Sequence, residues 1–154
     1  MTPSDRAHNW SAMNKREVAD FGLMEADRRF RREGFQVTKE RHRGRTRLHA
    51  RRQPGRSYEV RVATMRRPRG SYAYFTKASF TLSDGLLVAL ILLDEGCEPA
   101  AFLIPSTAWR EPSPLLCDRD YEGKASAPEW GIQVTGKSLP LLEDFSFAVQ
   151  ARLL

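Results

Sequence analysis

The stretch from Gly44 to Thr64 reads GRTRLHARRQPGRSYEVRVAT and decides the fold. It holds two short segments of alternating polar and apolar residues, Arg45 to Arg52 and Ser57 to Thr64, separated by Pro54-Gly55. Alternation with a period of two is typical of β-strands, and Pro-Gly is typical of turns. The sequence therefore predicts a β-hairpin.

The second strand of this hairpin has two unlike faces, because side chains along a strand alternate between its two sides. One face carries Tyr58, Val60 and Val62. The other carries Glu59, Arg61 and Ala63. We expect the first face to pack on the core and the second to form the floor of a site.

The flanking sequence predicts a mixed α/β domain. Asn14 is a suitable N-cap for a helix over residues 15 to 33, which Gly34 ends. Leu86 to Leu93 is a continuous apolar run, typical of a strand covered on both faces, and it forms a hairpin with 100 to 104. The strand candidates are 35–40, 45–52, 57–64, 72–76, 86–93 and 100–104.

The remaining segments have weaker patterns. Residues 1–13 lack periodicity and are expected to form a flexible arm before a single domain over 14–154. Residues 110–131 are rich in Pro, Asp and Gly and are expected to be a long surface excursion. Residues 132–135 are expected to form an edge strand, and 139–147 a closing helix or turn.

The composition limits the class of protein. With 154 residues and 41% hydrophobic content, the chain fits one globular domain. Its longest apolar run is far shorter than the roughly 20 residues of a membrane helix, and no signal peptide is recognisable, so a cytoplasmic location is expected. Two isolated cysteines and three histidines without ligand spacing predict neither a disulfide nor a zinc site.

The charge is strongly separated along the sequence. Residues 28–69 contain 16 Lys and Arg and three acids, a local net charge of +13. The rest of the chain has a net charge of −7, which the overall value of +6 conceals. Such separation favours a basic surface that meets a polyanion. Tyr72 and Tyr74 follow the basic loop and can either pack on the core or contact bases, whereas Phe75 is expected in the core.

The helix, the hairpin and the buried strand also carry a resemblance to a known family. Gly22-Leu23-Met24-Glu25 is similar to a Gly-x-x-Glu motif, Arg47-Leu48 lies where an Asp-Leu motif is expected, and Arg61-Val62-Ala63-Thr64 lies where Glu-Val-Lys-Thr is expected. These motifs belong to the PD-(D/E)XK, or restriction-endonuclease-like, superfamily. Segments 101–106 and 120–131 are similar to bacterial members of the same superfamily. The resemblance implies a central mixed sheet of four to five strands flanked by helices.

The resemblance also implies what the chain lacks. Members of the superfamily bind Mg²⁺ through an Asp and a Glu or Gln, while a Lys steadies the attacking water; a divalent cation needs such oxygen ligands. Here Arg47, Arg61 and Ala63 stand at the three positions, and a guanidinium repels a metal ion. No catalytic residue, metal or other cofactor is therefore expected.

The sequence predicts a non-catalytic nucleic-acid-binding protein, directed to the backbone of DNA, with a homodimer possible. The candidate contacts are Arg41, Arg43, Arg45, Arg47, Arg61, Arg66, Arg67 and Arg69. Two alternatives stay open. One is an active Mg²⁺-dependent endonuclease whose catalytic residues have migrated to Glu25, Glu59 and Arg61, with the metal held by Glu25, Glu40 and Glu59. The other is a protein-interaction module that docks an acidic partner on the basic face.

Overall fold

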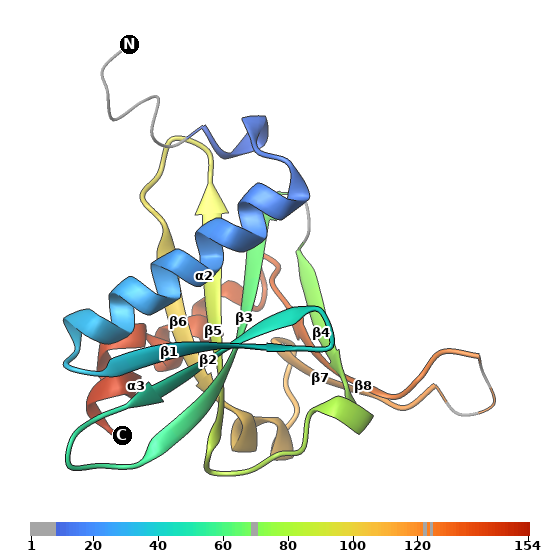
Figure 1. Ribbon diagram of the computed structural model, residues 1–154. Coiled ribbons are helices and arrows are strands. Elements are labelled where there is room, and N and C mark those ends of the chain that lie inside the picture. Colours follow the sequence, from blue (N-terminus) through green and yellow to red (C-terminus); the bar gives the residue numbers. More distant parts are fainter. Residues whose placement is uncertain (1–8, 69–70, 122, 124) are drawn as a thin grey trace.

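Strand β5 (Leu86–Asp94) lies inside the molecule, and its neighbours define the main sheet. The structure is a computed structural model that describes residues 9–68, 71–121, 123 and 125–154 (Figure 1). The main sheet has five strands in the order β1-β2-β3-β5-β6, in which β3 and β5 are parallel and the other pairs antiparallel. The other strands are β1 (Gln36–His42), β2 (Arg45–Arg51), β3 (Ser57–Arg67) and β6 (Ala100–Pro105).

The central hairpin predicted from the sequence is present. β2 and β3 are antiparallel, with Leu48 opposite Val60 and Ala50 opposite Tyr58. Side chains at these four positions are buried on one face of the sheet, as the alternation predicts. Every residue from Leu86 to Leu93 is also buried, which confirms that β5 is covered on both sides.

The two faces of the main sheet are covered by different kinds of structure. Helices α2 (Lys15–Arg32) and α3 (Phe147–Arg152) share one core with Leu48, Val60 and Ile91. The opposite face packs on a second, antiparallel sheet of order β4-β8-β7, through Met65, Leu90 and Ile132 among others. Among the described residues both α-helices therefore flank the same face of the main sheet, as predicted for the long helix, whereas the other face is covered mainly by the second sheet.

The second sheet corrects several expectations. Its strands are β4 (Tyr72–Thr76), β7 (Leu116–Arg119) and β8 (Glu129–Gln133). Residues 72–76 form a strand as predicted, but outside the main sheet. The surface excursion predicted over 110–131 contains β7 and most of β8, because Leu115 and Leu116 are buried against the main sheet. β8 is the central strand of its sheet, whereas an edge strand was predicted over 132–135.

Helix α2 begins and ends where the sequence predicts. The Asn14 side chain accepts a hydrogen bond from Glu17 N, and the Glu17 side chain accepts one from Asn14 N, which satisfies two free donors of the first turn. Gly34 takes a positive φ of 89° just beyond the end. Among the described residues, no helix is long and apolar enough to cross a membrane.

Short helical turns complete the chain. They are η1 (Trp10–Ala12), η2 (Lys77–Ser79), η3 (Ser106–Arg110) and η4 (Leu139–Phe145), the last leading into α3. Of the arm predicted over 1–13, residues 1–8 lie outside the described residues. Trp10 is 4% exposed and packs on Phe21 with ring centroids 4.9 Å apart. The chain is thus anchored on the domain from Trp10 onward.

Helix α2 approaches β3 most closely at Gly22. A Cβ atom placed on Gly22 would lie 1.7 Å from Thr64 Oγ1 and 2.9 Å from Thr64 Cβ. Contacts this short cannot be relieved by rotating the side chain alone. The absence of a side chain at Gly22 therefore sets the distance between the helix and the sheet.

We predict that Gly22→Ala destabilises the protein by about 1–3 kcal/mol, the usual cost of overpacking a core. This sign is opposite to the gain of roughly 1 kcal/mol that Ala gives over Gly in an unconstrained helix. Urea denaturation measures the effect, with Met24→Ala on the exposed side of the same helix as control. Because Thr64 is the clashing partner, Thr64→Ala should recover part of the loss in the double variant. An unchanged or raised stability of Gly22→Ala would contradict the close approach.

Candidate functional site

A groove of about 1710 Å³ crosses the molecule beside β3. We call it the basic groove. Its lining comes from the first turns of α2, the tip of the β1–β2 hairpin, the second half of β3, and β4 with the turn after it. The lining residues are Lys15, Arg16, Val18, Ala19, Asp20 and Leu23; 41–47; Arg61, Val62, Thr64, Met65 and Arg66; and 72–76 with Ala78 and Ser79.

The groove exists because β2 and β3 separate. They pair only where residues 48–51 face 57–60, after which Arg45 to Arg47 pair with β1 alone. On its other side β3 stays paired with β5 through Arg67. No described strand pairs with β3 beyond Val60 on the groove side. The second half of β3 is therefore an open strand edge in the groove.

The open edge presents backbone groups in a regular row. Glu59 N donates to Gly85 O on the β5 side, with a distance of 2.8 Å. Because consecutive residues of a strand turn their N–H and C=O groups to opposite sides, those of Val62, Thr64 and Arg66 point into the groove. Such groups require water or a ligand as partner.

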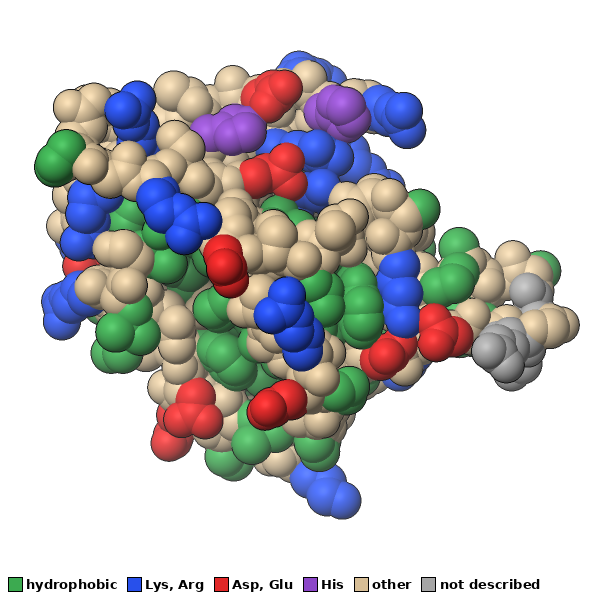
Figure 2. Space-filling view, turned by 90° about the horizontal axis from the view of Figure 1, so that it is seen from below, with side chains coloured by type: hydrophobic (Ala, Val, Ile, Leu, Met, Phe, Trp, Pro, Cys, Tyr) green, Lys and Arg blue, Asp and Glu red, His purple; other side chains and the backbone are tan. Residues whose placement is uncertain are grey.

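The side chains of the groove are mostly cationic. Eight of its lining residues are Lys or Arg and one, Asp20, is a carboxylate. In the space-filling view from below, Lys and Arg side chains gather beneath the two visible histidines, next to acidic side chains (Figure 2). Residues of α2, β1, β2 and β3, which are far apart in the sequence, therefore line the same groove.

The tip of the β1–β2 hairpin carries the most available cations. Arg41, Arg43 and Arg45 are exposed and have no hydrogen-bond or ion-pair partner among the described residues. The two-residue turn places Arg43 at φ 51° and Gly44 at φ 78°. Two positive φ values are typical of the type I′ turn, for which Asn-Gly is favoured. An arginine in this conformation costs about 1 kcal/mol, so the position is occupied against its local preference.

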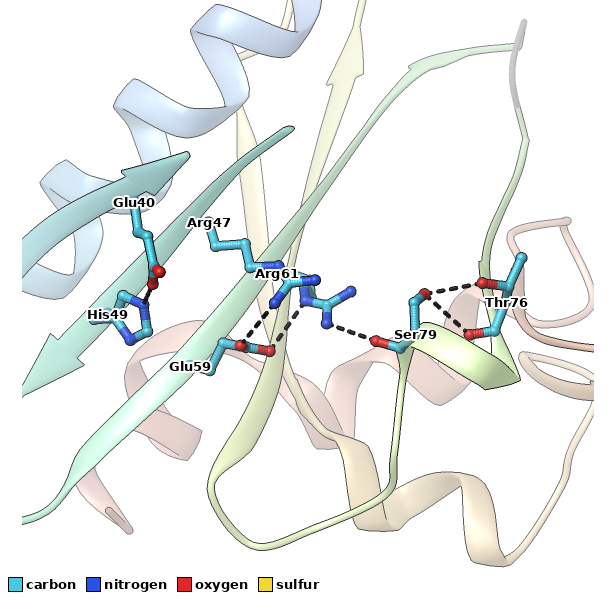
Figure 3. Close-up of polar contacts among 7 residues, drawn as sticks. All are labelled: Glu40, Arg47, His49, Glu59, Arg61, Thr76 and Ser79. Carbon is cyan, nitrogen blue, oxygen red and sulfur yellow. Dashed lines mark hydrogen bonds and ion pairs between the residues drawn. The ribbon is translucent and has the colours of Figure 1, made fainter. Parts of the chain in front are cut away.

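Beside the groove, Glu59 holds two of the arginines that line it, Arg47 and Arg61 (Figure 3). Arg47 Nη1 lies 3.2 Å from Glu59 Oε1, and Arg61 Nε lies 3.1 Å from Glu59 Oε2. Arg61 Nη2 also donates to Ser79 O at 2.6 Å, which ties β3 to the turn after β4. Both carboxylate oxygens of Glu59 are therefore used by cations.

The other predicted contacts are distributed less evenly. Arg66 lines the groove and donates to the carbonyl oxygens of Trp10 and Met13. Arg67 is not part of the lining and lies 3.7 Å from Asp94. Arg69 lies outside the described residues. Six of the eight arginines predicted as contacts thus line one groove.

Glu25, the acid matched to the superfamily motif, lies elsewhere. Its side chain is 2% exposed and accepts from Arg28 Nη2 and Arg29 Nε, each at 2.8 Å. Burial raises the pKa of the Glu25 carboxyl, but the hydrogen bonds and positive charges of the two arginines outweigh it, so the pKa is lowered overall. Glu25 is a structural ion-pair centre of α2.

The acids proposed for a migrated metal site do not meet. Glu25 belongs to α2, which covers the face of the sheet that carries Tyr58 and Val60. Glu59 alternates with those residues and points to the opposite face. Glu40 shares the Glu59 face, but its carboxylate contacts His49 Nε2 at 2.6 Å (Figure 3). No group of three potential metal ligands occurs among the described residues.

The groove also contains residues that sequence reasoning did not single out as contacts. Lys15 and Arg16 lie in the first turn of α2, where positive charge opposes the helix dipole. Their unfavourable position at the positive end of the helix dipole was the feature of the sequence that could have indicated a role in binding an anion. Tyr72 and Tyr74, whose role the sequence left open, both line the groove. Phe75 also belongs to the lining, but it is half-buried and its ring packs on Phe80 against the core, as expected.

Comparison with known proteins gives no assignment of this site. Neither a protein-family model, nor a curated protein, nor a solved structure matches the chain significantly. The groove must therefore be interpreted from its own geometry and charge.

We predict that Glu25→Gln lowers the free energy of unfolding by about 1–3 kcal/mol at neutral pH, because two arginines lose a buried anion. Because the pKa of Glu25 is lower in the folded than in the unfolded chain, its carboxylate stabilises the fold at pH values above the unfolded pKa of about 4.5. This contribution to stability is lost as the pH falls below that value. The wild-type advantage over the variant should therefore shrink in acid. Urea melts across this pH range measure it. Asp27→Asn on the same helix breaks only the more exposed pair with Arg31 and serves as control. A pH-independent difference would contradict the assignment.

Proposed function

We propose that the protein binds nucleic acid, with DNA as the target, by holding the phosphate backbone in the basic groove without cutting it. The observation that carries the proposal is the ratio of eight Lys and Arg side chains to one carboxylate around a single groove. Phosphate contacts by Lys, Arg and backbone N–H groups are the usual source of affinity that does not depend on base sequence.

The hairpin tip supports the same conclusion on independent grounds. Arg41, Arg43 and Arg45 are free to contact a ligand, and Arg43 is kept at a backbone conformation that disfavours it. A residue chosen only for folding would be Asn, Asp or Gly at that turn. Backbone strain at an exposed cation is typical of a site where charge matters more than stability.

The proposed scaffold is a degenerate restriction-endonuclease-like domain. The order of a helix, an antiparallel hairpin and a later buried strand supports the resemblance, which implies the same order. In the described part of the connection from β3 to β5, the chain forms β4 and η2. Fold likeness alone does not carry an activity, so the functional proposal rests on the groove.

The charges around Glu59 favour binding without catalysis. Where a metal-dependent nuclease would need free carboxylates, Glu59 is held by Arg47 and Arg61. Those guanidiniums can approach a phosphate, but they oppose a divalent cation in the same position. The arrangement supports a cationic surface that retains the backbone.

We predict salt-sensitive binding of nucleic acid, with affinity falling by several orders of magnitude between low and moderate salt if roughly six to ten phosphates are neutralised. Arg43→Asn is the sharpest variant, since two properties should change in opposite directions. Affinity should fall and the slope of log Kd against log salt should drop by about one. Stability should rise by about 1 kcal/mol, because Asn-Gly suits the turn. Fluorescence anisotropy and thermal denaturation measure the two effects.

The matched control is Lys137→Asn, which removes an exposed cation outside the groove and should leave affinity nearly unchanged. The probes are single-stranded DNA, double-stranded DNA and RNA of equal length. Absence of binding to all three at low salt would reject the proposal and favour the alternative of a protein-interaction module for an acidic partner. If Arg43→Asn lowers stability without lowering affinity, the hairpin tip is not part of the nucleic-acid interface.

We predict no cleavage of plasmid or oligonucleotide DNA in the presence of Mg²⁺ or Mn²⁺, and the same for Arg61→Ala, because the described lining contains one acid, Asp20, and the nearby Glu59 is held by two arginines. Agarose and denaturing gels over long incubations measure it. Metal-dependent cleavage by the wild type that disappears in Glu59→Ala would show an active nuclease, and the non-catalytic proposal would then be wrong.

A further inference from the structure

Two tyrosines form a stack on the β4 wall of the basic groove. The rings of Tyr72 and Tyr74 have centroids 6.2 Å apart and an interplanar angle of 22°. They are two residues apart on β4, so they project from the same face, and both line the groove. The arginines of the hairpin tip line the same groove from the β1–β2 hairpin.

Tyr72 is fixed on several sides. Its hydroxyl donates to Glu129 Oε2 on the adjacent strand, and its ring lies against Gly131, where an added Cβ would come within 2.2 Å of the phenol oxygen. The Arg119 guanidinium sits 4.3 Å from the ring centroid. Burial and the hydrogen bond to Glu129 raise the pKa of Tyr72, so the phenol stays protonated. The ring of Tyr72 therefore has one orientation.

Tyr74 is the outer member of the stack. Its side chain is 56% exposed. Its neighbour across the strand pair is Gly131, which has no side chain to cover it. Tyr72 is the only ring contact of Tyr74 among the described residues. Arg119, Tyr72 and Tyr74 thus form a series of stacked groups, and the last ring is largely exposed and belongs to a residue that lines the groove.

A ring held in this way suits an unpaired base. Aromatic side chains stack on bases with little dependence on base identity, at roughly 1–3 kcal/mol per base. In a duplex both faces of a base are covered by its neighbours, so a ring on a groove wall cannot reach them without unstacking. A single strand leaves base faces free while its phosphates remain available to arginine.

We propose that the basic groove is a single-strand site in which a base stacks on Tyr74. This inference rests on the proposed nucleic-acid function and specifies its target. The phosphates face Arg41, Arg43 and Arg45. The N–H groups of Val62, Thr64 and Arg66 on the open β3 edge add donors that contact the strand independently of its base sequence. Tyr72 acts as a positioning residue that holds Tyr74.

The test compares a fluorescein-labelled oligothymidylate with a duplex of equal length, by anisotropy at low salt, for the full chain and three variants. Tyr74→Ala should weaken binding of the single strand by about 5- to 100-fold, the loss of one stacked base, and leave duplex binding nearly unchanged. Tyr74→Phe keeps the ring and should bind like the wild type. Tyr74→Leu keeps apolar bulk without the ring and should resemble Tyr74→Ala.

A second readout places the contact directly. Photocrosslinking with bromodeoxyuridine in the single strand should label the peptide that contains Tyr74, and the label should be lost in Tyr74→Ala. Thermal denaturation confirms that the variants fold, which is expected because the side chain is exposed. Single-strand binding that does not depend on Tyr74, or an equal loss for both probes, would overturn the stacking site and leave the proposed function standing. Absence of binding to either probe would overturn both.

Discussion

Strand β3 is paired from Glu59 to its end at Arg67 on one side and along only four residues on the other, and the rest of the structure depends on this asymmetry. The parallel pairing with β5 places β3 in the middle of the core, so its position is fixed. Because β2 pairs with β3 only at residues 57–60, the rest of that edge of β3 is left unpaired by β2. A groove results from the geometry of strand pairing, without any special loop.

The limited pairing of β2 with β3 also determines where charge gathers. Because the tip of the β1–β2 hairpin is no longer paired with β3, its exposed arginines line the groove together with Arg61. Glu59 offsets the two innermost cations, which would otherwise repel each other at close range. Among the described residues, Arg41, Arg43 and Arg45 have no such internal partner, so their charge is available to a ligand.

Much of the main sheet could be predicted from local pattern, and less of the site. Asn14, Gly34 and the apolar run at Leu86 gave element types and ends that depend on adjacent residues only. β7 was missed because four residues between Pro- and Gly-rich segments carry no alternation. The opposite placement of Glu25 and Glu59 depends on which face of the sheet receives α2, and no local pattern contains that information. Lys15 joined the groove for the same reason, through packing between distant segments.

The open edge of β3 has a further consequence for how copies of the chain meet in a crowded solution. An unpaired strand edge is a ready template for another strand, and such edges are a common start of aggregation. Here any second copy that approached edge to edge would bring its own arginines against those of the first. Repulsion between the arginines of two copies therefore disfavours pairing of their open edges. An anion that binds in the groove would neutralise this repulsion, but it would also occupy the edge.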